Sequence, residues 1–180
     1  CEAVGADVHD VAKGMGLDNR IGSKFLHPGP GYGGSCFPKD TLALVKTAEF
    51  FDVSVSIVSD VVSYNAARKS AMSARVIEAC GGDVSGKNIA VLGLSFKPET
   101  DDMRESPALD IISALCLSGA NITAYDPAAI EEARPLLPET VVYVASAQDC
   151  LKGADCVVMA TEWNEFRALT PQIFQSLMAI

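Results

Sequence analysis

The sequence predicts an α/β protein in which a helical region over residues 1–83 precedes a domain built on a parallel sheet over residues 84–180. Apolar residues repeat at helical spacing in the first part of the chain, and short apolar runs alternate with helical patterns after Gly86. Such alternation is typical of a parallel sheet. Hydrophobic residues make up 49% of the 180 residues, so the chain can bury a sizeable core.

The helical region contains three predicted helices. The first is expected to start at residue 1 and to stop at Gly14 and Gly16, because apolar residues recur at Val4, Val8, Val11 and Met15. Residues 17–37 are rich in glycine and proline and are expected to form a loop, and a helix follows from Pro38 to near Asp52. A third pattern over residues 55–80 spans roughly 25 residues, which exceeds the usual globular length and favours a connecting or dimerising helix.

The second part of the chain contains four predicted strands, at residues 88–93, 121–125, 141–144 and 155–160. Helices are expected from Ser106-Pro107 to Leu117, weakly after residue 128, and after Ser146. Ligands of parallel sheets bind at the carboxyl ends of the strands. The loops at 93–104, 126–128 and 161–167 are therefore expected to share one face.

Charge and composition exclude several classes of function. The net charge is −9 and the sequence pI is about 4.6, which argues against binding to nucleic acid or to an anionic membrane surface. No run of 18 apolar residues and no signal peptide is present, so a cytoplasmic protein is expected. The six cysteines show no metal-ligand spacing and, like His9 and His27, predict no metal site.

Cys36 is the most informative single residue. It follows the run Gly29-Pro30-Gly31-Tyr32-Gly33-Gly34 and stands at the start of a predicted helix, with Lys39 one turn further on. A helix N-terminus and a nearby cation both favour thiolate over thiol, and the thiolate is the nucleophile. A lone cysteine is more often a small buried residue. Asp40 either complements the helix dipole or polarises a reacting group beside the sulfur, and its spacing alone does not decide between the two.

The segment from Leu94 to Ser106 is the second candidate for a site, because it leaves a strand and enters a helix, where anions bind. Gly93-Leu94-Ser95 does not match the GxGxxG fingerprint of dinucleotide sites. Lys97 and Arg104 are cations that could pair with phosphates, or they are solvated charges beside acidic neighbours. Arg20, in the loop before Cys36, has the same two explanations.

Several motifs resemble those of the UDP-glucose 6-dehydrogenase family of nucleotide-sugar dehydrogenases, and the resemblance covers nearly the whole chain. The two most specific motifs are PGPGYGGSCFPKD (residues 28–40) and GLSFKPETDDMRESP (residues 93–107). Shorter landmarks are Cys1-Glu2, Gly5-Ala6-Asp7-Val8, Arg20-Ile21-Gly22, Phe25-Leu26, Tyr125-Asp126-Pro127 and Thr161-Glu162-Trp163.

The resemblance implies a two-step, NAD-dependent oxidation of UDP-glucose to UDP-glucuronate. The first step gives an aldehyde, Cys36 adds to it as a nucleophile, and the thiohemiacetal is oxidised to a thioester that water hydrolyses. Asp40 would polarise the water or the oxyanion. The resemblance further implies that the substrate contacts Arg20 across a subunit interface, that NAD contacts Lys39 and Arg104, and that the UDP-sugar contacts Phe25, Leu26, Tyr32, Gly33, Phe96 and Lys97.

The same resemblance implies that residues 1–83 are a central dimerisation region and that residues 84–180 are a Rossmann-like UDP-sugar-binding domain. The family's N-terminal NAD domain has no counterpart in the sequence, and the family's last strand lies beyond it. The chain is therefore expected to be a fragment, inactive alone, from a homodimer or higher oligomer. Two other hypotheses are a UDP-sugar-binding module without chemistry and a structural dimerisation module that is indifferent to UDP.

Overall fold

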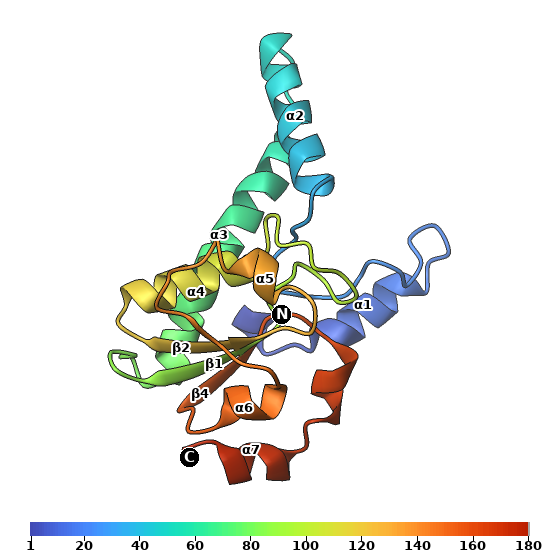
Figure 1. Cartoon of the computed structure of the whole chain (residues 1–180). Helices are drawn as coiled ribbons and strands as arrows, with labels where there is room; N and C mark the ends of the chain where they lie inside the picture. Colours follow the sequence, from blue (N-terminus) through green and yellow to red (C-terminus); the bar gives the residue numbers. More distant parts are fainter. Residues whose placement is uncertain (180) are drawn as a thin grey trace.

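A four-stranded parallel sheet forms the centre of the computed structural model, which describes residues 1–179 (Figure 1). The sheet consists of β1 (Asn88–Leu92), β2 (Asn121–Tyr125), β3 (Val142–Tyr143) and β4 (Cys156–Met159), in the order β3-β2-β1-β4. All neighbouring strands pair in parallel. The predicted α/β class and all four predicted strands are thereby confirmed, although β3 at the sheet edge is shorter than expected.

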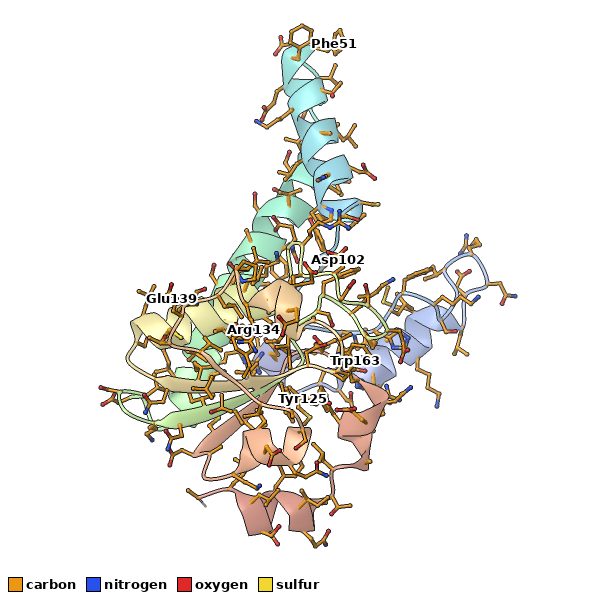
Figure 2. The ribbon with its side chains drawn as sticks, in the orientation of Figure 1. Phe51, Asp102, Tyr125, Arg134, Glu139 and Trp163 are labelled. Carbon is orange, nitrogen blue, oxygen red and sulfur yellow. The ribbon has the colours of Figure 1, made fainter. Side chains whose placement is uncertain are left out.

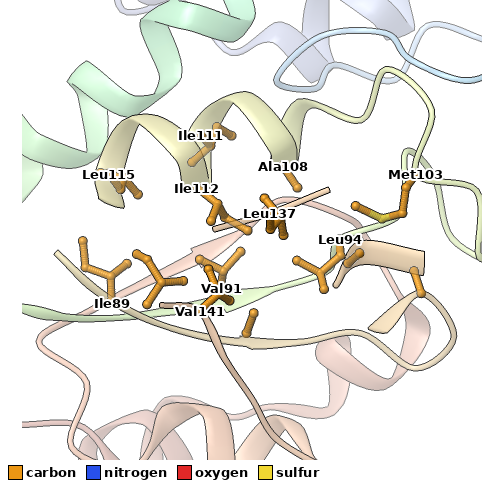
Figure 3. Close-up of a cluster of buried hydrophobic side chains, with 14 of the residues drawn as sticks. Ile89, Val91, Leu94, Met103, Ala108, Ile111, Ile112, Leu115, Leu137 and Val141 are labelled. Atoms are coloured by element: carbon orange, nitrogen blue, oxygen red, sulfur yellow. The ribbon is translucent and has the colours of Figure 1, made fainter. Parts of the chain in front are cut away.

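The two faces of the sheet are covered by different helices. Side chains alternate between the faces along a strand, so Ile89 and Val91 of β1 point to one side while Ala90 and Leu92 point to the other. The first face packs against α4 (Pro107–Leu117) and the short α5 (Ile130–Ala133). Figure 3 shows the α4 side chains Ile111, Ile112 and Leu115 above this face.

The second face packs against the later helices, α6 (Ala147–Leu151) and α7 (Pro171–Leu177), with the 3-10 helix η2 (Asn164–Ala168) between them. The helices expected from Ser106 and after Ser146 are both present, and each serine caps its helix. The Ser106 hydroxyl accepts a hydrogen bond from the Ala108 N–H, and the Ser146 hydroxyl accepts one from Asp149.

The helical region, as we call residues 1–83, extends away from the sheet. It comprises η1 (Glu2–Val4), α1 (Val8–Gly16), α2 (Phe37–Phe50) and α3 (Ser56–Ala79). Helices α2 and α3 pack into a projecting hairpin, and Figure 2 places Phe51 at its tip. At its other end α3 returns to the sheet region (residues 84–179), where Met72, Val76 and Ile77 pack against the core.

The prediction of a single first helix from residue 1 is wrong at its start. A 3-10 turn covers Glu2–Val4, Gly5 adopts the left-handed conformation (φ 67°), and α1 begins only after Asp7. The Asp7 carboxylate accepts the His9 N–H and caps the new helix, so local side-chain bonding overrides the apolar spacing. The predicted stop at Gly14 and Gly16 agrees with the end of α1 at Gly16.

The short N-terminal turn is held against α3 by charge. Glu2 forms ion pairs with Arg68 and Arg75 of α3, and the two guanidinium groups lower the pKa of this carboxyl from its ordinary value of 4.5 to about 2. The segment before α1 is therefore docked on the long helix by ionic contacts.

Candidate functional site

Cys36 lies at the N-terminus of α2, as the sequence predicts. It occupies the N-cap position, its side chain is exposed, and no side-chain hydrogen bond caps the helix. The Ser35 hydroxyl lies 3.6 Å from the Cys36 sulfur. Lys39 and Asp40 are exposed in the first turn beyond it. The sulfur is therefore accessible at the positive end of a 14-residue helix.

The segment before Cys36, residues 28–35, forms the glycine loop, and α3 holds it from one side. The Tyr32 N–H donates to the Asn65 side-chain oxygen at 2.8 Å, and the Asn65 amide donates back to the Tyr32 carbonyl at 3.1 Å. Gly31 has a φ of 145°, and a Cβ there would lie 2.9 Å from the Lys69 side chain. Glycine at this position therefore lets the loop approach the helix closely.

The loop between β1 and α4, residues 93–106, holds the glycine loop from the other side. The Gly34 N–H donates to the Arg104 carbonyl at 2.8 Å. A Cβ at Gly33 would overlap the Glu105 carbonyl oxygen, and one at Gly34 would lie 2.8 Å from the Phe96 ring. The structure thus brings together two motifs whose contacting residues are about seventy positions apart in the sequence.

The cations of the β1–α4 loop differ in their partners. Arg104 pairs with Asp102 at 2.9 Å, and this pairing raises the pKa of the Arg104 guanidinium and lowers that of the Asp102 carboxyl. Cys36 is the smallest of the contributors to the raised pKa of the Arg104 guanidinium. Figure 2 shows Asp102 between the start of α2 and the sheet. Lys97 is exposed, with its ammonium 5.4 Å from the centre of the Phe96 ring.

The three loops at the carboxyl ends of β1, β2 and β4 meet at Asp126, which confirms that they share one face. One carboxylate oxygen of Asp126 accepts from the N–H groups of Leu94 and Ser95 and from the Trp163 indole at 2.7–3.1 Å. The other accepts from two N–H groups of its own loop. Asp126 is 2% exposed, so this buried carboxylate determines how the β1–α4 loop leaves the sheet.

Arg20, Phe25 and Leu26 lie on the loop after α1, which extends to one side of the molecule (Figure 1). Arg20 pairs with Asp18 at 2.6 Å, and this contact raises the pKa of the guanidinium. Phe25 is 96% exposed and adopts a φ of 65°, which is unusual for a bulky side chain. Within residues 1–179, no hydrogen bond or ion pair joins these three side chains to the glycine loop or to Cys36.

A hollow of about 1340 Å³ opens beside the glycine loop, between α3 and the N-terminal segment. Its walls are mainly apolar and include His27, Pro28, Gly29, Gly31 and Tyr32 of the loop region. The other lining residues are Cys1, Glu2, Ala3, Gly5, Ala6, Val8, Ile57, Asp60, Val61, Tyr64, Asn65 and Arg68. The hollow is large enough for a sizeable organic ligand or for an additional structural element.

Three residues of this site, Asp126, Asn65 and Lys69, are not predicted as site residues by the sequence. Asp126 directly follows a predicted strand, where polar residues often face a ligand edge, and this position could have indicated its role. Asn65 and Lys69 are polar residues within a long helix, and polar residues in such a helix usually lie on its solvent-exposed face. Only the tertiary structure shows that both side chains point into the loops.

The other cysteines differ from Cys36 in their surroundings. Burial raises the pKa of the Cys150 thiol to about 12 and that of Cys156 to about 11, and it also raises that of Cys116. All six cysteines are free. Residues 1–179 contain no cluster of three His, Cys, Asp or Glu side chains suited to a metal ion, and none of the helices described there is long and apolar enough to span a bilayer.

Comparison with known proteins matches both regions to one family. Residues 1–67 match the central domain of the UDP-glucose/GDP-mannose dehydrogenase family, and residues 90–180 match its UDP binding domain. The UDP-glucose 6-dehydrogenase of Rhizobium meliloti is 57% identical over 99% of this chain and 40% of that protein, and UDP-glucose 6-dehydrogenase YwqF of Bacillus subtilis is 45% identical over 99% of this chain and 40% of that protein.

A solved UDP-glucose dehydrogenase from Pyrobaculum islandicum superposes with a TM-score of 0.87 at 37% identity, covering 93% of this chain and 39% of that one. The chain therefore spans about two fifths of the length of the relatives it matches. The family matches over both regions, together with the shared fold, show that this chain belongs to the UDP-glucose/GDP-mannose dehydrogenase family.

Proposed function

We propose that this chain supplies the nucleophilic thiol and the UDP-sugar contacts of a UDP-glucose 6-dehydrogenase, which oxidises UDP-glucose to UDP-glucuronate. The observation that carries the proposal is the contact between the Cys36 loop and the β1–α4 loop, through Gly34 and Arg104. The half-buried Phe96 ring packs against Gly34, two residues before the exposed Cys36, and carries the exposed Lys97 ammonium 5.4 Å from its centre; the two side chains can bind a ring and a phosphate. Relatives named UDP-glucose 6-dehydrogenase support the substrate class.

The proposed chemistry at Cys36 begins with an aldehyde at the sugar C6. The thiolate sulfur forms a bond to the carbonyl carbon, and the carbonyl oxygen takes up a proton to give a thiohemiacetal. NAD, when bound, supplies the hydride acceptor for the oxidations. Water then cleaves the resulting thioester and restores the thiol, and Asp40, in the first turn of α2, is the residue we assign to polarising that water.

The turn after β1 does not fit a dinucleotide. Its sequence lacks the GxGxxG spacing, and a Cβ at Gly93 would lie only 2.5 Å from the Thr161 side chain. The Ser95 N–H, which could otherwise face a phosphate, is used by Asp126. We therefore assign only Lys39 and Arg104 to the cofactor side of the thiol. We assign the UDP-sugar to Tyr32, Gly33, Phe96 and Lys97, with Phe25 and Leu26 joining from the loop after α1.

We further propose that the chain divides at residues 83 and 84 into a central dimerisation region and a UDP-sugar-binding domain. The helical region carries most of the exposed large apolar side chains, including Phe50, Phe51 and Ile57. Exposed apolar patches of this kind mark interaction surfaces. A homodimer or higher oligomer would cover them, and Arg20, remote from Cys36 in one chain, would then reach the site of a neighbouring subunit. Free thiols at all six cysteines favour action in the cytoplasm.

Two measurements on the 180-residue chain test the proposal. Calorimetric titration with UDP-glucose is expected to show binding that Lys97→Ala weakens about tenfold, because a phosphate contact is lost. Lys152→Ala, which removes an exposed lysine on the far side of the sheet region, is the matched control. Iodoacetamide should alkylate Cys36 faster than the other five cysteines. Absence of binding, or equal alkylation of Cys36 and the buried Cys150, would overturn the proposal.

The alternative is a UDP-sugar-binding or dimerisation module without chemistry in isolation. Turnover assays with UDP-glucose and NAD separate the two functions, since the isolated chain is expected to bind without turnover. Sedimentation with and without UDP-glucose distinguishes a dimerisation module, whose association would be indifferent to the ligand.

A further inference from the structure

Two polar residues of α3, one helical turn apart, contact both loops that form the site. Asn65 exchanges two hydrogen bonds with the Tyr32 backbone, in the manner of a neighbouring strand. Lys69 donates to the Glu105 carbonyl at 2.9 Å and to the Glu105 carboxylate at 3.1 Å. Residues i and i+4 of a helix share one face, so a single rigid element holds the glycine loop and the β1–α4 loop together.

The burial of Lys69 shows that this contact is specific. The residue is only 6% exposed, and its ammonium has two carboxylates within reach, Glu105 at 3.1 Å and Asp110 at 3.9 Å. Removing an ammonium from water is costly unless partners compensate for the lost hydration. Glu105 itself adopts a φ of 55°, a conformation that L residues rarely adopt, and the Lys69 contact holds its carbonyl in that orientation.

The orientation of Glu105 determines where its neighbours lie. The Glu105 carbonyl packs against Gly33, and the preceding Arg104 carbonyl accepts the Gly34 N–H. Both contacts are within three residues of Cys36. Displacement of either loop would therefore move the Arg104 backbone away from the residues that directly precede Cys36.

We infer that Asn65 and Lys69 are positioning residues for Cys36, which hold the glycine loop against the β1–α4 loop and so keep Arg104, whose carbonyl accepts the Gly34 N–H at 2.8 Å, next to the segment that carries the thiol. The inference rests on the proposed function only in taking Cys36 as the nucleophile. Neither side chain reaches the reacting atoms, and both act through the backbones of Tyr32 and Glu105.

The test compares Asn65→Ala and Lys69→Met with the unaltered 180-residue chain. Lys69→Met keeps the length and packing of the side chain but removes its donor. Ser70→Ala, on the exposed side of the same helix, is the matched control, because its hydroxyl bonds only to the Ala66 carbonyl of its own helix. Lys69→Arg restores a donor and a positive charge, and therefore serves as the rescue variant.

Two quantities are measured by mass spectrometry and NMR. Amide hydrogen exchange at Gly34 is expected to become roughly tenfold faster in Asn65→Ala and Lys69→Met, because anchoring hydrogen bonds are lost. The alkylation rate of Cys36 relative to Cys1, which is also exposed, is expected to fall about threefold, the effect of losing one nearby exposed charge. Lys69→Arg and Ser70→Ala should leave both quantities near their original values.

An unchanged Gly34 exchange rate and an unchanged Cys36-to-Cys1 ratio in both variants would overturn the inference. A loss of global stability with no change in that ratio would also overturn it, because it would show a purely structural role. Equal alkylation of Cys36 and Cys1 in the unaltered chain would instead contradict the proposed nucleophile, and Gly34 exchange would still decide whether α3 holds the loops.

Discussion

The helical region and the sheet region bury their apolar residues very differently. Within residues 1–179, Pro38 and Ala48 are the buried apolar side chains before residue 84, whereas both faces of the sheet carry a packed cluster. Large apolar side chains are nevertheless common in the helical region, where Val4, Phe50 and Ile57 are each about 80% exposed. The sheet region thus has a core of its own, and the helical region does not.

This difference shows how the site is supported. The β1–α4 loop rests on a buried core and on Asp126, so it has a fixed position. The glycine loop and Cys36 are held mainly through α3 and through that loop. The exposed apolar side chains of the helical region therefore lie on the same region as the exposed Cys36, and four experiments test this division.

The largest effect is expected from Asp126→Ala, which leaves buried N–H groups at three loops without an acceptor. Such groups each cost about 1–3 kcal/mol, so the free energy of unfolding should fall by at least about 3 kcal/mol. Urea denaturation monitored by the single tryptophan, Trp163, measures the change. Glu132→Ala, which removes an exposed carboxylate, is the control and should change stability by less than about 0.5 kcal/mol. A loss below 1 kcal/mol for Asp126→Ala would show that the loops do not depend on this residue.

The next largest effect is expected on the free energy of unfolding, when equivalent side chains are truncated in the two regions. Ile112→Ala removes a fully buried side chain between α4 and the sheet and should cost about 2–5 kcal/mol. Leu44→Ala removes a side chain that is 48% exposed on α2 and should cost less than about 1 kcal/mol. Similar losses at the two positions in chemical denaturation would contradict the comparison.

A smaller effect is expected on self-association. Ile57→Ser removes an apolar side chain from the exposed face of the helical region, and it should weaken association by roughly tenfold, the value of burying one such side chain. Sedimentation velocity across a concentration series measures this change. Leu136→Ser, at an exposed apolar position of the sheet region, is the control. If both variants weakened self-association equally, the helical region would not be the interaction surface.

The smallest effect is expected from acid. The folded-state pKa of Glu2 is lowered to about 2. The ionic contacts of Glu2 therefore stabilise the N-terminal segment above pH 4.5, and this stabilisation is lost as the pH falls from 4.5 toward 2. Hydrogen exchange of the N-terminal segment should therefore increase through this range. Glu2→Gln should already show fast exchange at neutral pH and little further change. A segment that stays protected at pH 2 would show that apolar contacts, rather than Arg68 and Arg75, hold it.

Local patterns predict most of the secondary structure. The long helix α3 and the strands β1 and β2 lie close to their predicted bounds, because apolar spacing and terminal glycines act over a few residues. The start of α1 was wrong because the Asp7 cap competes with apolar spacing. The roles of Cys36 and the substrate residues remain predictions.

The sequence by itself determined the α/β class, the order of helices and strands, and the position of Cys36 at a helix start, since each depends on neighbouring residues. Only the tertiary structure decided which distant segments meet: Asn65 and Lys69 with the two loops, Asp126 with three strand ends, and Gly34 with Arg104. Hydrogen bonds between residues 30 to 70 positions apart leave no periodic trace in a sequence, because packing of the sheet and α3 brings them together.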